Sequence, residues 1–268
     1  MDLRSFELAA GSVIGRDHRV IPRNSQDASA FVSTPDFAVA VVTDGCGSSA
    51  RSEVGAVLGA RLAISSIQWQ LERQGAVDWR LVERHILAGL HQLAGNLGGS
   101  YEANVQEYFL FTLVACVMTA QTARFVAVGD GLVVVNDEVI ELGPFPGNQP
   151  PYLGYGLLSG EGPRFELVRE VSMAQLQSFL IGTDGACDLL RLAGHPLPGS
   201  SVPVGPIAQF WTDEAVFRNP AVLSRRLKLI GRDVTRRTPT GGVTTDHGLL
   251  PDDTTMIVGR LAKGSDPT

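Results

Sequence analysis

The sequence places an aspartate at two matching points where an apolar run ends. The run that starts at Phe37 leads into Thr-Asp-Gly at Asp44, and the run that starts at Phe179 leads into Thr-Asp-Gly at Asp184. An aspartate at the end of a buried strand is held at a sheet edge by rigid backbone, and the glycine after it lets a ligand approach the main chain. Mg²⁺ and Mn²⁺ prefer carboxylate, carbonyl and water oxygens. The repeated pattern therefore indicates a divalent-cation site.

Three further acidic segments fit the same scheme. Asp27 stands at the start of a predicted strand, and Asp130 lies between two glycines. Asp252 and Asp253 stand together at the start of the last predicted strand. A single Asp-Gly pair at a strand end is usually an ordinary turn, because both residues favour turns. Carboxylates that converge repel one another unless cations neutralise them, so a convergent set would indicate metal.

Short apolar runs bounded by Gly, Asp or Pro recur along the chain and predict β-strands. They cover residues 28–33, 37–43, 109–119, 123–128, 132–135, 139–142, 165–171, 179–183 and 255–261. The residues Asn136-Asp137-Glu138 separate two of these runs and predict a hairpin. Consecutive strands with short connections favour antiparallel pairing over a parallel, doubly wound sheet.

Two helices are predicted between the second and third of these runs. Residues 52–74 and 78–97 carry apolar side chains at helical spacing, with Asp78 as the N-cap of the second helix. The two form a helical hairpin across Gly75 that can cover a sheet face. A third helix is predicted at 220–231. Because runs of strands are separated from runs of helices, the order predicts an α+β fold.

Segments rich in Gly, Pro, Ser or Thr predict irregular structure at 144–163, 193–206 and 238–251. The last two bracket the third helix, and we expect residues from about 193 to 250 to form a flap or insert that can move. No long linker divides the chain. We therefore expect a single domain over residues 1–268.

Composition narrows the class of protein. The net charge of −6 argues against nonspecific nucleic-acid binding. The N-terminal residues lack the basic patch and apolar run of a signal peptide, and no apolar stretch approaches the roughly 20 residues that span a bilayer. Cys46, Cys116 and Cys187 make an odd count without CxxC spacing, which argues against a disulfide framework or a cysteine zinc site. These features predict a cytoplasmic protein outside the membrane.

Five motifs follow one another along the chain: QDA at 26–28, DGCGS at 44–48, VGDG at 128–131, TDGACD at 183–188 and DDTT at 252–255. In this order they resemble the metal-dependent Ser/Thr protein phosphatase family, type 2C. The chain is most similar to the short bacterial branch, in which a Gly-x-x-His segment (here 15–18) precedes the first motif. The resemblance covers residues from about 11 to 261. It implies an αββα four-layer sandwich, in which two antiparallel sheets face each other and a helix pair covers each outer side.

The resemblance also implies a centre of two Mn²⁺ or Mg²⁺ ions in a cleft at one sheet edge. Its ligands would be Asp44, which bridges both cations, the Gly45 carbonyl and Asp27 on one cation, and Asp184 and Asp252 on the other. Asp130 and Asp188 match positions that in relatives contribute to a third, weaker metal site. Asp253 stands where the family usually has Asn, so Asp252 is the expected ligand of the pair.

The chain departs from the family pattern at the phosphate anchor. Relatives usually carry an Arg five residues before the first-motif Asp, where this chain has Pro22. Arg23 and Arg19 lie on either side, and we favour Arg23 as the residue that binds the substrate phosphate. With Asp44 and Asp184, Arg23 completes the expected catalytic set.

The implied reaction is hydrolysis of phosphoserine and phosphothreonine in proteins. Two cations lower the pKa of a bridging water, and the hydroxide attacks phosphorus in line with the departing oxygen. The absence of a Cys-x₅-Arg loop argues against a cysteine-dependent phosphatase, and the absence of an Asp-x-Asp-x-Thr motif argues against an aspartyl-phosphate phosphatase. We expect a monomer that acts on phosphorylated proteins and opposes a cognate Ser/Thr kinase.

Two other functions stay open. One is a regulatory or binding module of the same fold with weak or no catalysis, which the displaced Arg favours and the complete set of aspartates disfavours. The other is a different metal-dependent hydrolase built on the same carboxylates. An assay for hydrolysis in the presence of divalent cations separates them.

Three side features add hypotheses about the site. His18 is a candidate proton donor to the leaving group. Cys46 and Cys187 follow expected metal aspartates closely, so oxidation at either is a candidate route to inhibition. Residues 218–237 contain seven basic residues and one acidic residue, and such a run either is an ordinary solvated helix face or guides phosphorylated proteins.

Overall fold

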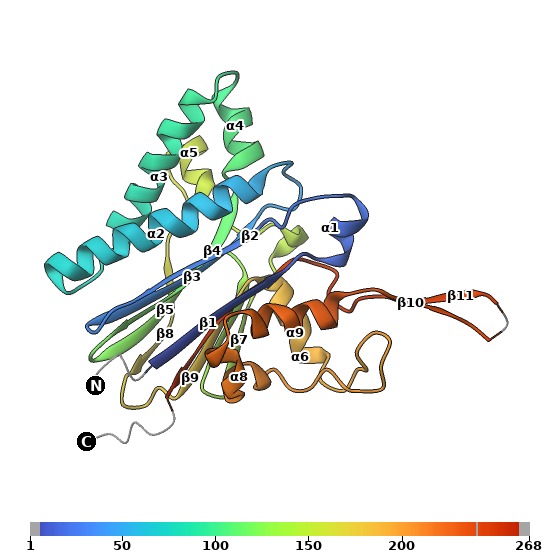
Figure 1. Ribbon diagram of the computed structural model, residues 1–268. Coiled ribbons are helices and arrows are strands. Elements are labelled where there is room, and N and C mark those ends of the chain that lie inside the picture. The colour runs from blue at the N-terminus through green and yellow to red at the C-terminus, as the bar shows by residue number, and fades with distance from the viewer. Residues whose placement is uncertain (1–5, 240, 263–268) are drawn as a thin grey trace.

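The computed structural model describes residues 6–239 and 241–262, and within them two antiparallel sheets of five strands pack face to face (Figure 1). The first sheet has the order β2-β3-β4-β5-β8, with the strands β2 (Asp27–Ser33), β3 (Phe37–Gly45), β4 (Phe111–Thr119), β5 (Thr122–Val128) and β8 (Glu166–Ser172). The second has the order β1-β12-β9-β6-β7, with β1 (Phe6–Val13), β12 (Thr254–Leu261), β9 (Ser178–Gly182), β6 (Gly131–Val135) and β7 (Glu138–Leu142). The predicted α+β sandwich is confirmed.

The core lies between the two sheets and explains why the central strands read as continuous apolar runs. Val114 of β4, Val133 of β6 and Ile257 of β12 are almost fully buried in one cluster. Helices cover the other face of β3, so nearly all of its residues are buried. A strand that is covered on both faces cannot alternate between apolar and polar residues. The predicted hairpin is also present, with a turn at Asn136 and Asp137 between β6 and β7.

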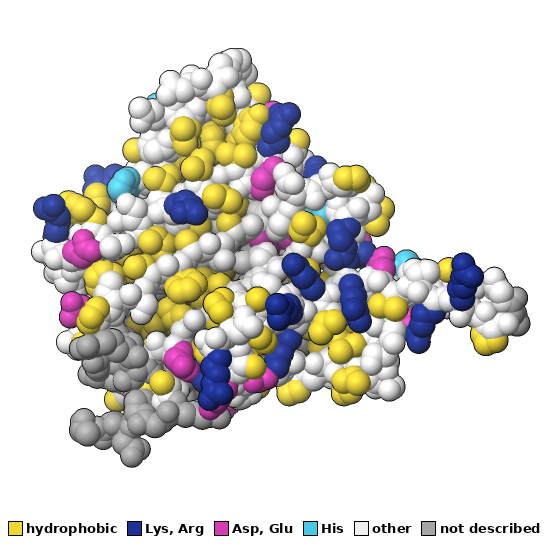
Figure 2. All heavy atoms as spheres, in the orientation of Figure 1, with side chains coloured by type: hydrophobic (Ala, Val, Ile, Leu, Met, Phe, Trp, Pro, Cys, Tyr) yellow, Lys and Arg dark blue, Asp and Glu magenta, His cyan; other side chains and the backbone are white. Residues whose placement is uncertain are grey.

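Helix α9 (Ala221–Gly231) covers the outer face of the second sheet, together with α7 (Gln209–Thr212) and α8 (Glu214–Arg218). Leu223 and Leu227 of α9 are fully buried there. A Cβ at Gly11 of β1 would lie 1.9 Å from Leu223 Cδ2, so glycine is what lets this helix approach the strand. On the solvent side, Lys and Arg side chains gather over α8, α9 and α1 (Arg16–Val20) (Figure 2).

Beyond α9 the chain forms the hairpin of β10 (Val234–Arg237) and β11 (Val243–Asp246), which extends away from the two sheets (Figure 1). Both strands are largely exposed. The region from about 193 to 250 thus combines helices that pack on the second sheet with a hairpin that projects from them. Its movement as a flap stays a prediction.

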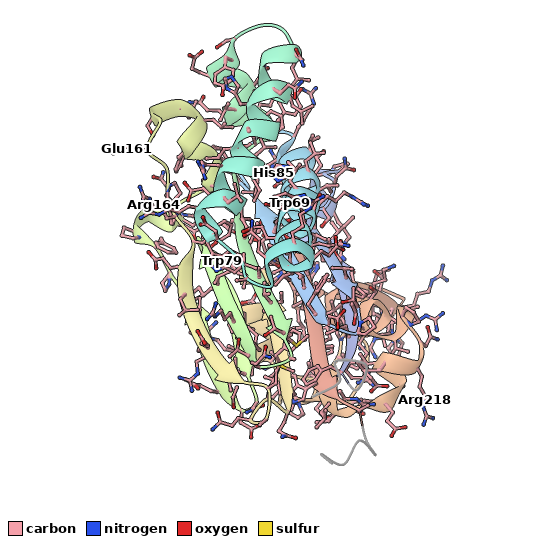
Figure 3. The ribbon with its side chains drawn as sticks, turned by 90° about the vertical axis from the view of Figure 1, so that its left-hand side faces the viewer. Trp69, Trp79, His85, Glu161, Arg164 and Arg218 are labelled. Carbon is pink, nitrogen blue, oxygen red and sulfur yellow. The ribbon has the colours of Figure 1, made fainter. Side chains whose placement is uncertain are left out.

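The helices α2 (Ser52–Gln74), α3 (Trp79–Asn96) and α4 (Tyr101–Tyr108) cover the outer face of the first sheet, with Trp69 and Trp79 on that side (Figure 3). From Ser52 to Ser66 the buried residues of α2 are all small, and a Cβ at Gly59 would lie 2.4 Å from the ring of Phe111. Asp78 caps α3 as predicted, and its side chain accepts a hydrogen bond from Arg80 N at 2.9 Å. Close approach of α2 to the sheet positions the loop that follows β3.

The structure adds elements that the sequence did not predict. They are β1, α1, α4, α7, α8, β10, β11 and the short helical turns η2 (Pro146–Asn148), η3 (Leu153–Tyr155), α5 (Gly156–Ser159), η4 (Asp184–Cys187) and α6 (Asp188–Arg191). Strand β11 lies within the segment 238–251, so the prediction that this whole segment is irregular is wrong. Strand β1 pairs with β12 along its whole length, although its sequence FELAAGSV has few residues that favour strands. No helix in the described part of the chain is both long and apolar enough to cross a bilayer.

Candidate metal centre

A cavity of about 470 Å³ opens at the edge of the sandwich where several strands begin or end. Asp44, Asp130, Asp184 and Asp252 all line it. They come from the end of β3, the β5–β6 connection, the residue pair after β9 and the residues before β12. The antiparallel strands therefore bring together carboxylates that are up to 208 positions apart in the chain, since 252 minus 44 is 208.

The carboxylates in this cavity raise one another's pKa. Burial raises the pKa of Asp44 well above its ordinary value, and the charges of Asp27 and Asp184 raise it further. Burial raises the pKa of Asp184 to about 7, with the charges of Asp252 and Asp130 adding to the effect. The pKa of Asp130 is raised to about 6, mainly by burial. Such a cluster has to take up protons or cations near neutral pH.

Asp27 lies behind the cavity wall, directly opposite Asp44 in the β2–β3 pair. Its Oδ2 accepts a hydrogen bond from Thr183 Oγ1 at 2.8 Å, which links it to the residue before Asp184. Its Oδ1 is buried and, like Oδ1 of Asp130, has no hydrogen-bond partner among the described residues. A buried acceptor without a partner is unfavourable, so both oxygens suit a cation or an ordered water.

The donor set fits hard divalent cations whose coordination is completed by other oxygens. In the described ranges, no three Asp, Glu, His or Cys side chains come close enough to enclose a metal on their own. Mg²⁺ is commonly held by one or two carboxylates, with water for the remaining positions. Gly45 also lines the cavity, where a Cβ would lie 2.7 Å from Ser52 Oγ, so only glycine fits at this point.

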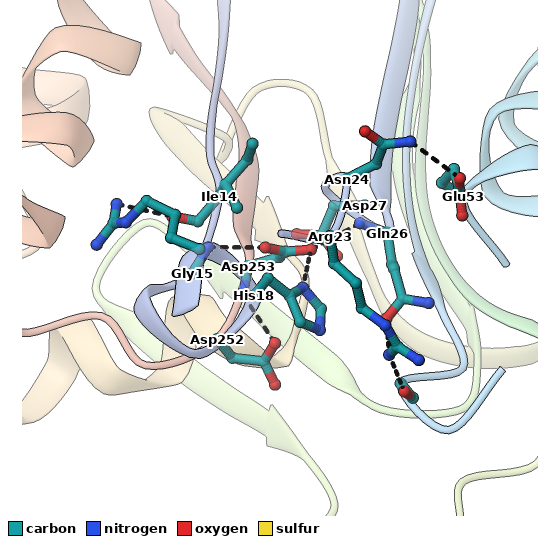
Figure 4. A network of polar contacts seen from close by, with 12 residues as sticks. Ile14, Gly15, His18, Arg23, Asn24, Gln26, Asp27, Glu53, Asp252 and Asp253 are labelled. Carbon is teal, nitrogen blue, oxygen red and sulfur yellow. Dashed lines mark hydrogen bonds and ion pairs between the residues drawn. The ribbon is translucent and has the colours of Figure 1, made fainter. Parts of the chain in front are cut away.

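Asp252 and Asp253 have different surroundings (Figure 4). The Asp253 side chain is buried and accepts hydrogen bonds from Gly15 N at 2.7 Å, Gln26 N at 2.6 Å and His18 Nδ1 at 2.9 Å. Asp252 lines the cavity, and its Oδ1 accepts a hydrogen bond from Asp253 N at 2.8 Å. Asp253 is thus occupied by structural contacts, whereas Asp252 presents its carboxylate to the cavity.

Asp188 lies beside the cavity and is absent from its lining. It begins the short helix α6 and is partly buried. The pKa of Asp188 is raised, mainly by burial. The charge of Arg191 opposes this shift, and the charge of Asp252 adds to it. Asp188 is therefore close enough to the other carboxylates to interact with their charges.

Of the two candidate arginines, Arg19 belongs to α1 and Arg23 follows it, and their side chains make different contacts. Arg23 donates hydrogen bonds to the carbonyl oxygen of Gly47 and, at 3.5 Å, to Gln26 Oε1, and both of these residues line the cavity (Figure 4). Arg19 donates instead to the carbonyl oxygens of Ile14 and of Gly231, at the end of α9. The structure therefore brings Arg23 to the rim of the cavity and holds Arg19 away from it.

Sequence reasoning missed the part of the lining that the 144–163 segment supplies. Asn148, Gln149, Tyr152 and Tyr155 of this segment line the cavity. The segment's Pro and Gly content indicated only a loop, so no spacing signal pointed to the cavity. Burial raises the pKa of Tyr152 strongly, and a hydrogen bond with Cys46 adds to this.

Cys46 also lines the cavity, and its Sγ lies 3.1 Å from Ser48 Oγ. Burial by itself would raise the pKa of this thiol. Hydrogen bonds with Ser48, Tyr152 and Ser49 together outweigh burial, so the pKa is below its ordinary value. Cys187 differs, because burial raises its pKa to about 12.

Comparisons with known proteins agree with the geometry. The family model described as protein phosphatase 2C matches residues 14–212. No curated protein matches the chain. Among solved structures, a bacterial serine phosphatase is 12% identical with a TM-score of 0.57, covering 98% of this chain and 100% of that one. The Ser/Thr phosphatase Stp1 from Staphylococcus aureus is 12% identical with a TM-score of 0.55, covering 95% and 94%. The Ser/Thr phosphatase of S. agalactiae is 13% identical with a TM-score of 0.52, covering 96% and 99%.

Proposed function

Because the chain belongs to the protein phosphatase 2C family, we propose that it hydrolyses phosphoserine and phosphothreonine in proteins with the aid of Mn²⁺ or Mg²⁺. One observation carries the proposal. Asp44, Asp130, Asp184 and Asp252 converge on one cavity, and burial raises the pKa of each of them. Cations would satisfy the charges that these carboxylates bring together.

The ligands would divide between two cations. Asp44 would serve both, with Asp27 and the Gly45 carbonyl on one cation and Asp184 and Asp252 on the other. Asp130 and Asp188 would contribute to a third, weaker site. When bound, the cations would supply a hydroxide nucleophile and offset charge on the phosphoryl oxygens.

The chain's own residues would orient the substrate. Arg23 at the cavity rim is the candidate anchor for the phosphate, because its guanidinium presents donors in a fork that matches phosphate oxygens. His18 lines the cavity, and Asp253 holds its Nδ1. The ring would thereby be fixed in place. When it carries a proton on both nitrogens, it would keep its Nδ1–H on Asp253 and give the Nε2 proton to the departing Ser or Thr oxygen.

The proposal extends to the protein's setting. A phosphatase of this kind would act in the cytoplasm as a monomer, on proteins phosphorylated by a cognate Ser/Thr kinase. It needs neither nucleic acid nor a membrane.

A regulatory module with weak or no catalysis is the second candidate. The observation that favours it is Pro22 at the position of the usual phosphate-binding Arg. Arg23 is also engaged with the Gly47 carbonyl, a contact that it would have to give up in order to reach the phosphate.

Hydrolysis of an aryl phosphate and of a phosphothreonine peptide, measured with Mn²⁺, Mg²⁺ or EDTA, tests the proposal. We expect metal-dependent activity that Asp44→Asn reduces to the background rate. Asp36→Asn is the matched control, because Asp36 is exposed in the β2–β3 turn. Inactivity of the wild type with every divalent cation would favour the regulatory module, and activity in Asp44→Asn would refute the assigned ligands.

A further inference from the structure

A second hollow of about 490 Å³ adjoins the metal cavity. The two share Ser48, Leu110 and Tyr155 in their linings. The lining of the second hollow comes mainly from the loop after β3 and from the helices α4 and α5. These two helices contact each other and lie side by side in Figure 1. We call the second hollow the flanking pocket and define it by Ser48, Ala50, Ala103, Gln106, Tyr155 and Leu158. Its size is within the range of about 300–1,000 Å³ that is usual for ligand pockets.

The lining of the flanking pocket offers no free charge among the described residues. Ala50, Ala103 and Leu158 are apolar, and Leu158 is 38% exposed. Glu107, the charged residue of the lining, is paired with Arg51. A charged ligand side chain would therefore lose water there without gaining a partner, whereas an aliphatic one would cover exposed apolar surface.

Tyr155 forms the boundary between the two hollows. Its ring packs edge-on against that of Tyr152, with the ring centroids 5.6 Å apart, and Tyr152 lines the metal cavity. Ser49 stabilises the opposite wall, because its Oγ donates a hydrogen bond to the carbonyl oxygen of Gln106 at 2.6 Å. A chain that leaves the metal cavity across Tyr155 thus enters a pocket whose walls are already held in place.

We propose that the flanking pocket selects phosphoprotein substrates that carry an uncharged aliphatic residue close to the phosphoserine or phosphothreonine. The inference rests on the proposed function, since the phosphate has to lie among the aspartates for its neighbours to reach this pocket. Continuity of the two hollows identifies the occupant as the substrate segment that flanks the phosphorylated residue. The selected side chain is Leu, Ile, Val or Met.

Phosphothreonine peptides with Leu, Lys or Glu at each position from −3 to +3 test this inference by phosphate release. We expect kcat/KM to favour Leu over Lys by about tenfold at one of these positions, as is usual for a pocket that selects an aliphatic group. Leu158→Glu should reverse that order and favour Lys, because it places a carboxylate in an uncharged lining. Ala103→Glu, on the exposed side of α4, should change the order in the same direction and guards against misfolding of either variant.

Leu167→Glu is the matched control. It makes the same substitution at a side chain that is 59% exposed on β8, outside both hollows, and it should keep the wild-type preference. Equal kcat/KM for the Leu and Lys peptides would overturn the proposed selectivity of the flanking pocket, and so would an unchanged order in both Leu158→Glu and Ala103→Glu. Hydrolysis of an aryl phosphate by the wild type would still support the proposed function in either case. If the wild type hydrolyses nothing, fluorescence anisotropy of the same peptides measures the preference as binding, and a flat result overturns it.

Discussion

The Asp253 carboxylate lies 2.9 Å from Nδ1 of His18, and it also receives the backbone N–H groups of Gly15 and Gln26. One buried side chain at the start of β12 thereby fixes both ends of the α1 segment. The family's usual Asn could not accept all of these bonds, because an amide has one acceptor oxygen and its NH₂ group would face a backbone N–H.

Asp253→Asn should therefore lower the free energy of unfolding by about 1–3 kcal/mol, since a buried donor loses its partner. Urea unfolding in EDTA measures the loss. Asp252→Asn is the control next to it: its amide oxygen can still accept from Asp253 N, and neutralising it removes repulsion, so stability without metal should not fall. Equal stability of Asp253→Asn and wild type would contradict the structural role of Asp253.

The stability of the metal-free protein should fall as pH rises from about 4 to 7. Asp184 and Asp130 have folded-state pKa values of about 7 and about 6, above the ordinary value of 3.8. The folded state therefore binds protons that the unfolded state has already released, and this stabilisation is lost as pH passes through the folded-state values. Thermal unfolding in EDTA checks the slope. Mn²⁺ should raise Tm more at pH 8 than at pH 5.5, and Asp184→Asn should flatten the metal-free curve. A Tm that rises with pH in EDTA would contradict the raised folded-state pKa values of these carboxylates.

Arg23 and Arg19 should differ in their effect on the substrate. Arg23→Ala should raise KM for an aryl phosphate by about tenfold or more, because it removes a charge-assisted hydrogen bond. Arg19→Ala should leave KM unchanged, since its guanidinium donates to the carbonyl oxygens of Ile14 and Gly231. Steady-state kinetics of both variants decide the assignment. The reverse pattern would identify Arg19 as the residue that binds the phosphate.

Charge reversal on the exposed face of α9 should weaken activity on acidic phosphoproteins. Arg225 and Lys228 of α9 and Arg232 just after it follow helical spacing and are exposed, and none has an ion-pair partner in the described part of the chain. Arg226 is less suitable for this test, because it pairs with Asp213 and is partly buried. Arg225→Glu with Lys228→Glu should lower kcat/KM on a phosphoprotein in low salt, with aryl phosphate hydrolysis unaffected. Arg164→Glu, on the side shown in Figure 3, is the control, and a loss that persists at high salt would point to misfolding instead of charge.

Peroxide should abolish the proposed phosphatase activity through Cys46 and not through Cys187. Hydrogen bonds lower the pKa of the Cys46 thiol at the cavity, whereas burial raises that of Cys187 to about 12, and the thiolate is the reactive form. Cys46→Ser should slow inactivation and Cys187→Ser should not. The rate of activity loss in peroxide, with recovery in dithiothreitol, measures this, and protection by Cys187→Ser alone would reverse the assignment.

Much of the fold could be predicted from local pattern, whereas the convergence of the aspartates was implied only by the family resemblance. Asp44 and Asp184 each end an apolar run, so their place at a sheet edge follows from the strands themselves. Strand β1 could not be predicted, because its Ala and Gly residues are explained only by the approach of α9 to Gly11. The place of Tyr152 and Tyr155 in the cavity lining could not be predicted, because it depends on the path of an irregular segment. The role of Asp253 depends on partners more than 220 positions away, as 253 minus 26 is 227.

The pairing of Asp27 with Asp44 across β2 and β3 has a consequence for how the edge of the first sheet assembles. Strand β2 lies at that edge, and its outer residues are largely exposed, so few buried side chains resist a slip of one residue. Such a slip turns every side chain of a strand to its opposite face. Asp27 would then point away from Thr183 and from the other carboxylates. Cation binding through Asp27 would therefore require the native register of β2, and it would stabilise that register over the slipped alternatives.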